Sequence, residues 1–426
     1  MSKIFFGLYD AAGYLARLSD GLEELGNECT YLNLSPDYFS YRQQSSSWHL
    51  RVHENFHKRL QSRLVSIPQI IMSRLVLFAK ALFTHKVFVF TGYDSFFGFR
   101  ELGLLRLFDK VIIVVYLGTD ARPPYLSGKY LDDNMGVLDL DATHRETKKV
   151  KQRLQRVERF ATHIINHTGT SNFATRDFIK LLAVGIPTTF AELETGHKES
   201  RSLVGGGKHR ILHAPSRPEA KGTKRVREAI AKLEKLGYQI EYVELKGVPN
   251  AEVLRKIKWA DMVIDELYSD TLMATFAAEA VTSGRPSLTC GYYSGDIRAD
   301  HSGIELPEVR YHDPADFEDA LIDMLDNMQR EKAVAEKVRL WLEKNWSQKS
   351  VAQKFLLIVR DEVPKEWIGS PSQIEYNMGW GLSKANWLSL NKRYIDKFGT
   401  NGLFIQDTDR LAGYMREISA IEGQDR

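Results

Sequence analysis

The sequence predicts an α/β protein made of two doubly wound, Rossmann-like domains that face a cleft, followed by an aromatic-rich C-terminal extension. Three observations predict this fold. Short apolar, β-branched runs alternate with helical patterns in both halves of the chain, a glycine-rich stretch interrupts the alternation, and 426 residues suffice for two domains. Such near-continuous apolar strands are typical of parallel sheets covered by helices on both faces.

The first half carries the alternation through residues 1–191, which we predict to be the N-terminal domain. KIFFGLY is expected to form a buried strand, and residues 11–25 a helix with a leucine-rich face. The later expected strands are CTYLNL, KVFVF at 86–90, KVIIVVYL at 110–117 and HIIN at 163–166. Gly, Asp or Asn residues bound these runs, as expected for strand–helix turns.

Residues 192–208 lose the pattern and contain three consecutive glycines, so we predict an interdomain linker there. A second domain is predicted over residues 209–360. Its expected strands are 210–213, 239–245, 261–265 and 286–290, and its expected helices are 222–236, 250–259, 274–283, 313–327, 329–345 and 348–360. Residues 361–426 carry three tryptophans, and the sequence does not indicate their role.

The composition is that of an ordinary globular chain. The formal net charge is only +3, so no overall basic character favours nucleic acid as a partner. Cys29 and Cys290 lie far apart, which fits a reducing compartment. The N-terminus lacks the apolar region of a signal peptide, and no uninterrupted apolar run reaches the roughly 18–20 residues of a membrane span. We therefore expect a cytoplasmic protein.

One basic segment leaves a membrane contact open. No acidic residue occurs between Asn55 and Tyr93, and Ile71, Leu75, Phe78 and Leu82 fall on one helical face. A basic amphipathic helix can lie on anionic lipid, which would make the protein peripheral at the inner face of the membrane. A core helix with a charged rim has the same pattern, and it is the favoured interpretation.

The stretch RILHAPSRPEAKGT, which starts at Arg210, predicts an anion-binding site. A short strand runs into a turn with two prolines, and Lys221-Gly222 stands immediately before a helix. Unpaired N–H groups and the helix dipole favour an anion there, and Arg217 and Lys221 would add positive charge. In the alternative, both cations face solvent, although cations at a helix N-terminus oppose the dipole.

A lone acid, Glu279, follows about sixty residues later in ATFAAEAV. Its neighbours from Phe276 to Val281 are small or apolar, which indicates a buried carboxylate that needs partners. The two hydroxyls of a ribose could be these partners, and so could an arginine elsewhere in the chain or the amides of the helix. Lys221 and Glu279 are together expected to bind opposite ends of one nucleoside diphosphate.

These two segments resemble the GT-B glycosyltransferases, in particular the retaining, family-4-like members. The resemblance covers roughly residues 1–360 and is strongest between 209 and 290, where ADMVIDELYSDTLMATFAAEAVTSGRPSL is similar to the family's D…G-x-F-x-x-E-A-x-x-x-G-x-P segment. It implies a GT-B architecture with a donor-binding second domain. The implied donor-binding residues are Arg217, Lys221 and Gly222 at the diphosphate, Thr275 and Phe276 through their backbone, and Glu279 at the ribose.

In the first half, VVYLGTDARP at 114–123 resembles the family's GSDxR loop. The resemblance implies that Asp120 orients an acceptor hydroxyl or stabilises positive charge on the sugar, so Asp120 and Lys221 are the candidate catalytic residues. A turn or cap role for Asp120 is the alternative, and Arg122 could contact the sugar or pair with Asp120. Gly13, at the first strand–helix turn, would let the backbone approach the donor or acceptor.

The chain departs from the family at two positions. Thr271 stands where the family has the first acid of a Glu-x7-Glu pair, and Leu117 where it often has histidine. No histidine spacing predicts a metal site, and Asp132-Asp133 is interpreted as part of a solvated loop.

The resemblance implies a retaining, metal-independent transferase without a cofactor, whose co-substrate is a nucleotide diphosphate sugar. It would move a hexosyl or N-acetylhexosaminyl unit to a glycan or lipid-linked saccharide acceptor, in surface polysaccharide biosynthesis. The alternative is a non-catalytic GT-B protein that binds the nucleotide sugar, because the acid at 271 is missing.

Overall fold

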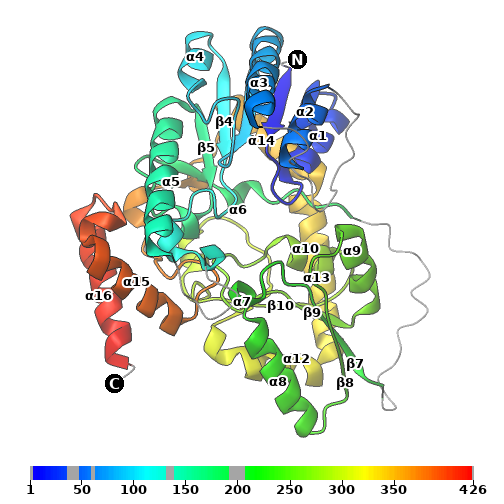
Figure 1. The fold of residues 1–426 in the computed structure, drawn as a ribbon. Coiled ribbons are helices and arrows are strands. Elements are labelled where there is room, and N and C mark those ends of the chain that lie inside the picture. The colour runs from blue at the N-terminus through cyan, green and yellow to red at the C-terminus, as the bar shows by residue number, and fades with distance from the viewer. Residues whose placement is uncertain (1–2, 36–47, 59–62, 131–138, 191–206, 425–426) are drawn as a thin grey trace.

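The computed structural model describes residues 3–35, 48–58, 63–130, 139–190 and 207–424. Within them the chain forms two sheets, each flanked by helices, which lie one above the other in Figure 1. The predicted linker at 192–208 lies almost entirely outside the described residues.

The first sheet contains all five strands that the sequence predicts in the first half, together with two strands that were not predicted, β6 and β12. Its order is β12-β6-β5-β4-β3-β1-β2, and all neighbours are parallel except β12 and β6. The strands are β1 (Ile4–Leu8), β2 (Cys29–Asn33), β3 (Val87–Thr91), β4 (Val111–Val115), β5 (His163–Asn166), β6 (Phe178–Lys180) and β12 (Ile368–Gly369). Every residue of β1 and β3 is buried, because helices cover both faces of the sheet.

Helices of the first unit connect these strands. They are α1 (Tyr14–Glu24), α2 (Trp48–His57), α3 (Arg63–Thr84), α4 (Leu102–Leu107), α5 (Leu140–Phe160) and α6 (Leu181–Val184). Helix α1 buries its leucine face as predicted, and the Asp10 carboxylate accepts hydrogen bonds from the N–H groups of Leu15 and Ala16 in its first turn. This cap fixes the loop between β1 and α1 at the carboxyl edge of the sheet.

The second sheet is entirely parallel and has the order β11-β10-β9-β7-β8. Its strands are β7 (His209–His213), β8 (Ile240–Glu244), β9 (Met262–Ile264), β10 (Ser287–Cys290) and β11 (Arg310–His312). The associated helices are α7 (Pro218–Lys221), α8 (Thr223–Lys235), α9 (Asn250–Trp259), α10 (Thr275–Thr282), α11 (Ile297–Asp300), α12 (Phe317–Asp326), α13 (Met328–Trp346) and α14 (Gln348–Val359). The strand order reverses at β1 in the first sheet and at β7 in the second.

Helix α14 returns to the first unit, although its sequence was expected to close the second domain. It packs so closely on α1 that a Cβ atom at Gly21 would lie 2.2 Å from the backbone oxygen of Gln348. Glycine is therefore required where the two helices meet. The domain limits remain a prediction, but this contact places residues 348–359 on the N-terminal helical layer.

The C-terminal extension covers one flank of the first unit. β12 pairs with the edge strand β6, and α15 (Lys384–Phe398) and α16 (Thr408–Gln424) lie beside α5 (Figure 1). Trp387 and Tyr394 are fully buried, and the Tyr394 hydroxyl hydrogen-bonds His144 of α5 at 2.9 Å. Of the three tryptophans that the sequence left without a role, Trp387 is thus a core residue of this flank, whereas Trp367 and Trp380 are half-buried.

Candidate active site

A cleft with about 700 Å³ of empty space, partly open to solvent, lies between the carboxyl edges of the two sheets. Its first wall comes from the loops after β1, β3, β4 and β5, and its second wall from the segment between β9 and α10. The lining residues include Ala11, Ala12, Tyr93, Leu117, Gly118, His167, Asp270, Thr271, Ala274 and Thr275. Parallel α/β sheets bind their ligands at this edge, near the points where the strand order reverses.

The first wall includes the turn that the sequence marked at Gly13. This glycine has a φ of 72° and precedes α1, a left-handed conformation that glycine adopts without steric cost. Ala11, Ala12 and Tyr14 on either side of it line the cleft. The predicted close approach of backbone to ligand at this turn is therefore sterically available.

The second wall presents the start of helix α10. Ala274 precedes the helix, and no side chain among the described residues caps it. The first N–H groups of a helix have no partner within it, so this end attracts an anion. Ala274 and Thr275 line the cleft, whereas the Phe276 side chain packs among apolar residues of α9. Phe276 can therefore contribute its backbone and not its ring.

Two buried polar atoms in the cleft walls lack a hydrogen-bond partner within the described chain, Nε2 of His167 and Oγ1 of Thr271. Nδ1 of His167 accepts a hydrogen bond from the N–H of Gly169 at 3.1 Å, so the proton of the neutral ring is on Nε2. Burial, with help from His301 and Arg122, lowers the pKa of His167 to about 3, which keeps the ring neutral. Both residues line the cleft, so this unpartnered N–H and this hydroxyl are candidate groups for binding a ligand there.

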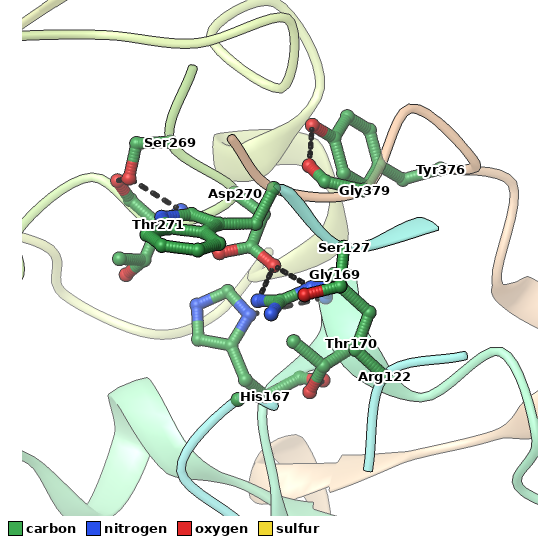
Figure 2. Close-up of polar contacts among 12 residues, drawn as sticks. Arg122, Ser127, His167, Gly169, Thr170, Ser269, Asp270, Thr271, Tyr376 and Gly379 are labelled. Atoms are coloured by element: carbon green, nitrogen blue, oxygen red, sulfur yellow. Dashed lines mark hydrogen bonds and ion pairs between the residues drawn. The ribbon is translucent and has the colours of Figure 1, made fainter. Parts of the chain in front are cut away.

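Sequence reasoning missed His167 as a site residue. A signal was available, because His167 follows β5 directly. β5 neighbours β4, which ends just before Leu117, and neighbouring parallel strands end at the same edge of the sheet, so His167 and Leu117 are expected to lie close together. Figure 2 shows the His167 ring beside the buried pair of Arg122 and Asp270, with Thr271 nearby.

Arg122 joins the two units through Asp270. Its Nε atom donates to Oδ2 of Asp270 at 2.9 Å, and Nη2 donates to the same oxygen. Both side chains are almost fully buried. Burial raises the pKa of Asp270, although Arg122 opposes this effect. Arg122 therefore pairs with Asp270 of the second unit rather than with Asp120, its alternative partner in the sequence.

Asp120 does not have the environment that its predicted catalytic role requires. Its Oδ1 accepts the N–H groups of Leu117 and Gly118 at 3.0 and 2.9 Å, and its Oδ2 accepts the N–H of Gly92 at 3.1 Å. The residue is 1% exposed, and burial raises its pKa to about 6. The carboxylate thus holds the loop after β4, and the geometry supports the turn-forming alternative.

Replacing Asp120 with Asn tests this structural role. The pKa of Asp120 is raised from an ordinary 3.8 to about 6, so its contribution to stability is fully present below pH 4 and is lost as the pH rises through 6. We expect the advantage of the wild type over Asp120→Asn to shrink by about 3 kcal/mol between pH 4 and pH 7. Urea unfolding at several pH values measures this difference, and a pH-independent difference contradicts it.

Lys221 lies at the carboxyl end of β9, where two acids already neutralise it. Its ammonium is 2.7 Å from Asp265 Oδ1 and 3.1 Å from Glu266 Oε2, and the residue is only 8% exposed. Burial lowers the pKa of Lys221, but the two carboxylates raise it above its usual value overall. Burial also raises the pKa of Asp265 to about 6, and Asp265 Oδ2 has no partner within the described chain. A diphosphate bound at Lys221 would therefore share the ammonium group of this lysine with Asp265 and Glu266.

The neighbours of Lys221 have different roles. Gly222 has a φ of 73° and begins α8, and a Cβ atom there would lie 2.9 Å from the Cβ of Leu267. Arg217 is exposed and donates to the carbonyl oxygen of Lys129 at 3.1 Å. Arg217 therefore contacts the first unit at the surface and does not accompany Lys221 in the buried cluster.

Glu279 is buried as predicted, and protein groups satisfy it. Arg17 donates to its Oε1 at 3.0 Å, and Asn250 Nδ2 lies 3.3 and 3.2 Å from its two oxygens. This is the arginine pairing that the sequence left as an alternative to ribose. The charge of Glu279 raises the pKa of Asp265, as that of Lys221 lowers it.

The C-terminal extension reaches the edge of this cluster. The backbone N–H and carbonyl of Trp380 hydrogen-bond Leu126 and Gly128, and its indole N–H donates to Glu266 Oε2 at 3.0 Å. A Cβ atom at Gly128 would lie 2.2 Å from the carbonyl oxygen of Gly381. Glycine thus permits this contact, which ties the extension to both sheets.

Among the described residues no group of three or more His, Cys, Asp or Glu side chains is arranged to hold a metal ion. Asp132 and Asp133 lie outside those residues. Metal independence therefore remains a prediction.

No protein-family model and no curated protein sequence matches this chain. Solved structures do match this chain. HepE from Anabaena, in complex with UDP and glucose, matches with a TM-score of 0.50 and 9% identity over 85% of this chain and 100% of that chain. The apo structure of OtsA matches with a TM-score of 0.52 and 12% identity over the same shares. The chain has the GT-B fold of these glycosyltransferase structures, which confirms the predicted architecture.

Proposed function

We propose that this chain is a glycosyltransferase that takes its sugar from a nucleotide diphosphate sugar bound in the cleft. One observation carries the proposal. The start of α10, Thr271 and His167 line a single cavity at the carboxyl edges of both sheets, and the Thr271 hydroxyl and the His167 N–H have no partner within the described chain. An anion at the helix end and hydroxyl groups beside it would satisfy these groups, and a sugar diphosphate supplies both. The HepE complex with UDP and glucose supports this choice of donor.

The chemistry follows from where charge develops. When the glycosidic bond breaks, negative charge grows on the leaving diphosphate, so donors fixed near it stabilise the transition state more than the ground state. The N–H groups at the start of α10 line the cleft and are suited to this role, whereas Lys221 lies outside the lining and would contribute only by sharing its ammonium with Asp265 and Glu266. We propose transfer with retention, in which the leaving diphosphate takes the acceptor proton.

His167 and Thr271 take the places of the family groups that this chain lacks. The Leu117 side chain cannot donate a hydrogen bond, but His167, immediately after the neighbouring strand β5, lies in the same wall and has an Nε2–H without a partner in the described chain. Thr271 presents a hydroxyl where the family has an acid. We propose that both contact hydroxyl groups of the transferred hexosyl or N-acetylhexosaminyl unit, and that a glycan or lipid-linked acceptor binds beside the first unit.

Replacing Thr271 with Val tests the donor-sugar contact. Valine keeps the shape of threonine and removes an unpartnered buried hydroxyl, so the free energy of unfolding should stay equal or rise by about 1 kcal/mol. Turnover of the nucleotide sugar should fall about tenfold, because one hydrogen bond to the sugar is lost. Unchanged turnover would remove Thr271 from the site. Thr282→Val, at the end of α10, is the control, because Thr282 does not line the cleft and its hydroxyl bonds the Glu279 backbone.

A thermal-shift screen across UDP-, GDP- and ADP-sugars identifies the donor. A ligand that binds only the folded state raises the apparent melting temperature by mass action. We expect one nucleotide series to stabilise the protein and to release nucleoside diphosphate slowly during incubation. Saturable binding without release would favour the non-catalytic alternative, and no stabilisation by any nucleotide would contradict both.

A further inference from the structure

The large apolar side chains that remain exposed gather on one end of the molecule. Twelve large apolar side chains are exposed in the described part of the chain. Nine of them belong to α3, to α4 or to Phe108, which follows α4. They are Ile67, Ile71, Met72, Leu75, Val76, Phe83, Leu104, Leu107 and Phe108. We call these nine residues the α3–α4 apolar face. Phe83 and Leu107 are the most exposed, at 76% and 78%.

This face is continuous. Ile67, Ile71 and Leu75 are four residues apart, so they form one stripe along α3. At the end of that helix the rings of Phe83 and Phe108 meet edge to face, with their centroids 6.4 Å apart. In Figure 1 α3 and α4 lie together at the top of the molecule. Contiguous exposed apolar surface of this kind marks an interaction site.

The C-terminal half of α3 is packed against the first unit, with Phe78, Ala81 and Leu82 buried. Phe78 contacts the rings of Phe96 and Phe97 edge to face, and Arg74 forms an ion pair with Asp94 at 2.7 Å. The segment Ser66–Thr84 is long and apolar enough to cross a membrane by composition, but these contacts hold α3 along the domain. Phe78 and Leu82 are buried while Ile71 and Leu75 are exposed, so the favoured core-helix interpretation explains only part of the segment.

The charges around the face are mainly positive. From residue 66 to residue 110 the sequence has six Lys or Arg residues and three acids. Two of the acids are engaged within the protein, because Asp94 pairs with Arg74 and Glu101 accepts two backbone N–H groups. The exposed cations of this region are Lys80, Lys86, Arg100 and Arg106.

We propose that the α3–α4 apolar face docks this protein on the surface of an anionic lipid bilayer. The apolar side chains would enter the boundary between headgroups and acyl chains, while the surrounding cations contact lipid phosphates. Because α3 leads directly into β3, its Ile67 end is the end nearer the cleft. Docking along α3 would therefore bring the cleft close to an acceptor held in the membrane. This inference does not depend on the donor, because it needs no nucleotide.

Vesicle flotation of the full chain tests the proposal. We expect the wild type to float with vesicles of phosphatidylglycerol and phosphatidylcholine in equal amounts, and to bind pure phosphatidylcholine vesicles about tenfold less. The double variant Phe83→Ser/Leu107→Ser should lose at least about tenfold in binding. Leu236→Ser/Leu340→Ser is the matched control, since these leucines are 63% and 52% exposed elsewhere, and it should bind like the wild type.

Three results would overturn the proposal. The wild type could stay with neither kind of vesicle, or both double variants could bind equally. Alternatively, sedimentation equilibrium could show a dimer that Phe83→Ser/Leu107→Ser dissociates, which would make a second copy of this chain the occupant of the face. Because each substitution replaces an exposed side chain, the variants should unfold at the wild-type temperature.

Discussion

Replacing Lys221 with Met is expected to lower the free energy of unfolding by about 3–5 kcal/mol at pH 8, and to abolish turnover. Asp265 and Glu266 are 1% and 2% exposed, and without the ammonium they are two buried acids without a counter-charge. Without the ammonium the pKa of Glu266 would rise above its value in the unfolded chain, and that of Asp265, already about 6, would rise further. The stability deficit should therefore be largest above the raised pKa values and shrink as the pH falls towards 5.

Lys224→Met provides the control for this measurement. Lys224 lies three residues further on, in the first turn of α8, and its side chain is 92% exposed and 4.0 Å from its ion-pair partner Glu228. Its loss should cost at most about 0.5 kcal/mol. Urea unfolding of both variants at pH 5 and pH 8 gives the comparison. Equal stability of the two variants at pH 8 would show that Lys221 does not hold the acid cluster together.

Replacing His167 with Asn is expected to reduce kcat/KM for the nucleotide sugar by about 10²-fold while stability changes by less than about 1 kcal/mol. The Asn oxygen occupies the place of Nδ1 and can accept the Gly169 N–H, whereas no group replaces the Nε2–H donor. A donor aimed at developing charge or at a substrate hydroxyl contributes on this scale. Because the pKa of His167 is about 3, its loss should leave the shape of the pH–rate profile unchanged above pH 5.

His167→Gln separates donation from packing. The Gln amide can place an N–H near the position of Nε2, so this variant should recover part of the activity that His167→Asn loses. If both variants turn over substrate like the wild type, His167 is a structural residue. If both unfold, the ring is needed for packing and the role proposed for it is wrong.

Most of the fold could be predicted from the sequence, because its strands and helices follow local patterns of apolar residues. Apolar runs such as KVFVF became fully buried parallel strands, and the leucine face of α1 became core. The strands β6, β11 and β12 escaped prediction because each has only two or three residues and none is an all-apolar run like the equally short β9. The antiparallel pairing of β12 with β6 also joins segments almost two hundred residues apart, which no local pattern records.

The site was less predictable, because its partners are distant in the chain. Residue types located the cluster around position 221 and the buried acid at 279, but not what would pair with them. Arg17 and Glu279 are 262 residues apart, and Arg122 and Asp270 are 148 residues apart. For Asp120 the resemblance of its loop implied a catalytic role and turn formation was the alternative, because an acid after a strand suits both. Only the three backbone N–H groups around it distinguish these roles.

Release of nucleoside diphosphate by the wild type and by the double variant His167→Asn/Thr271→Val tests the central claim most directly. The purified proteins would be incubated with the nucleotide sugar that stabilises the wild type most, and the freed diphosphate would be counted against folded protein. A cleft that binds the donor predicts slow release by the wild type and near-complete loss in an equally stable double variant. Equal release by both proteins would mean that the transfer takes place somewhere other than between these two sheets.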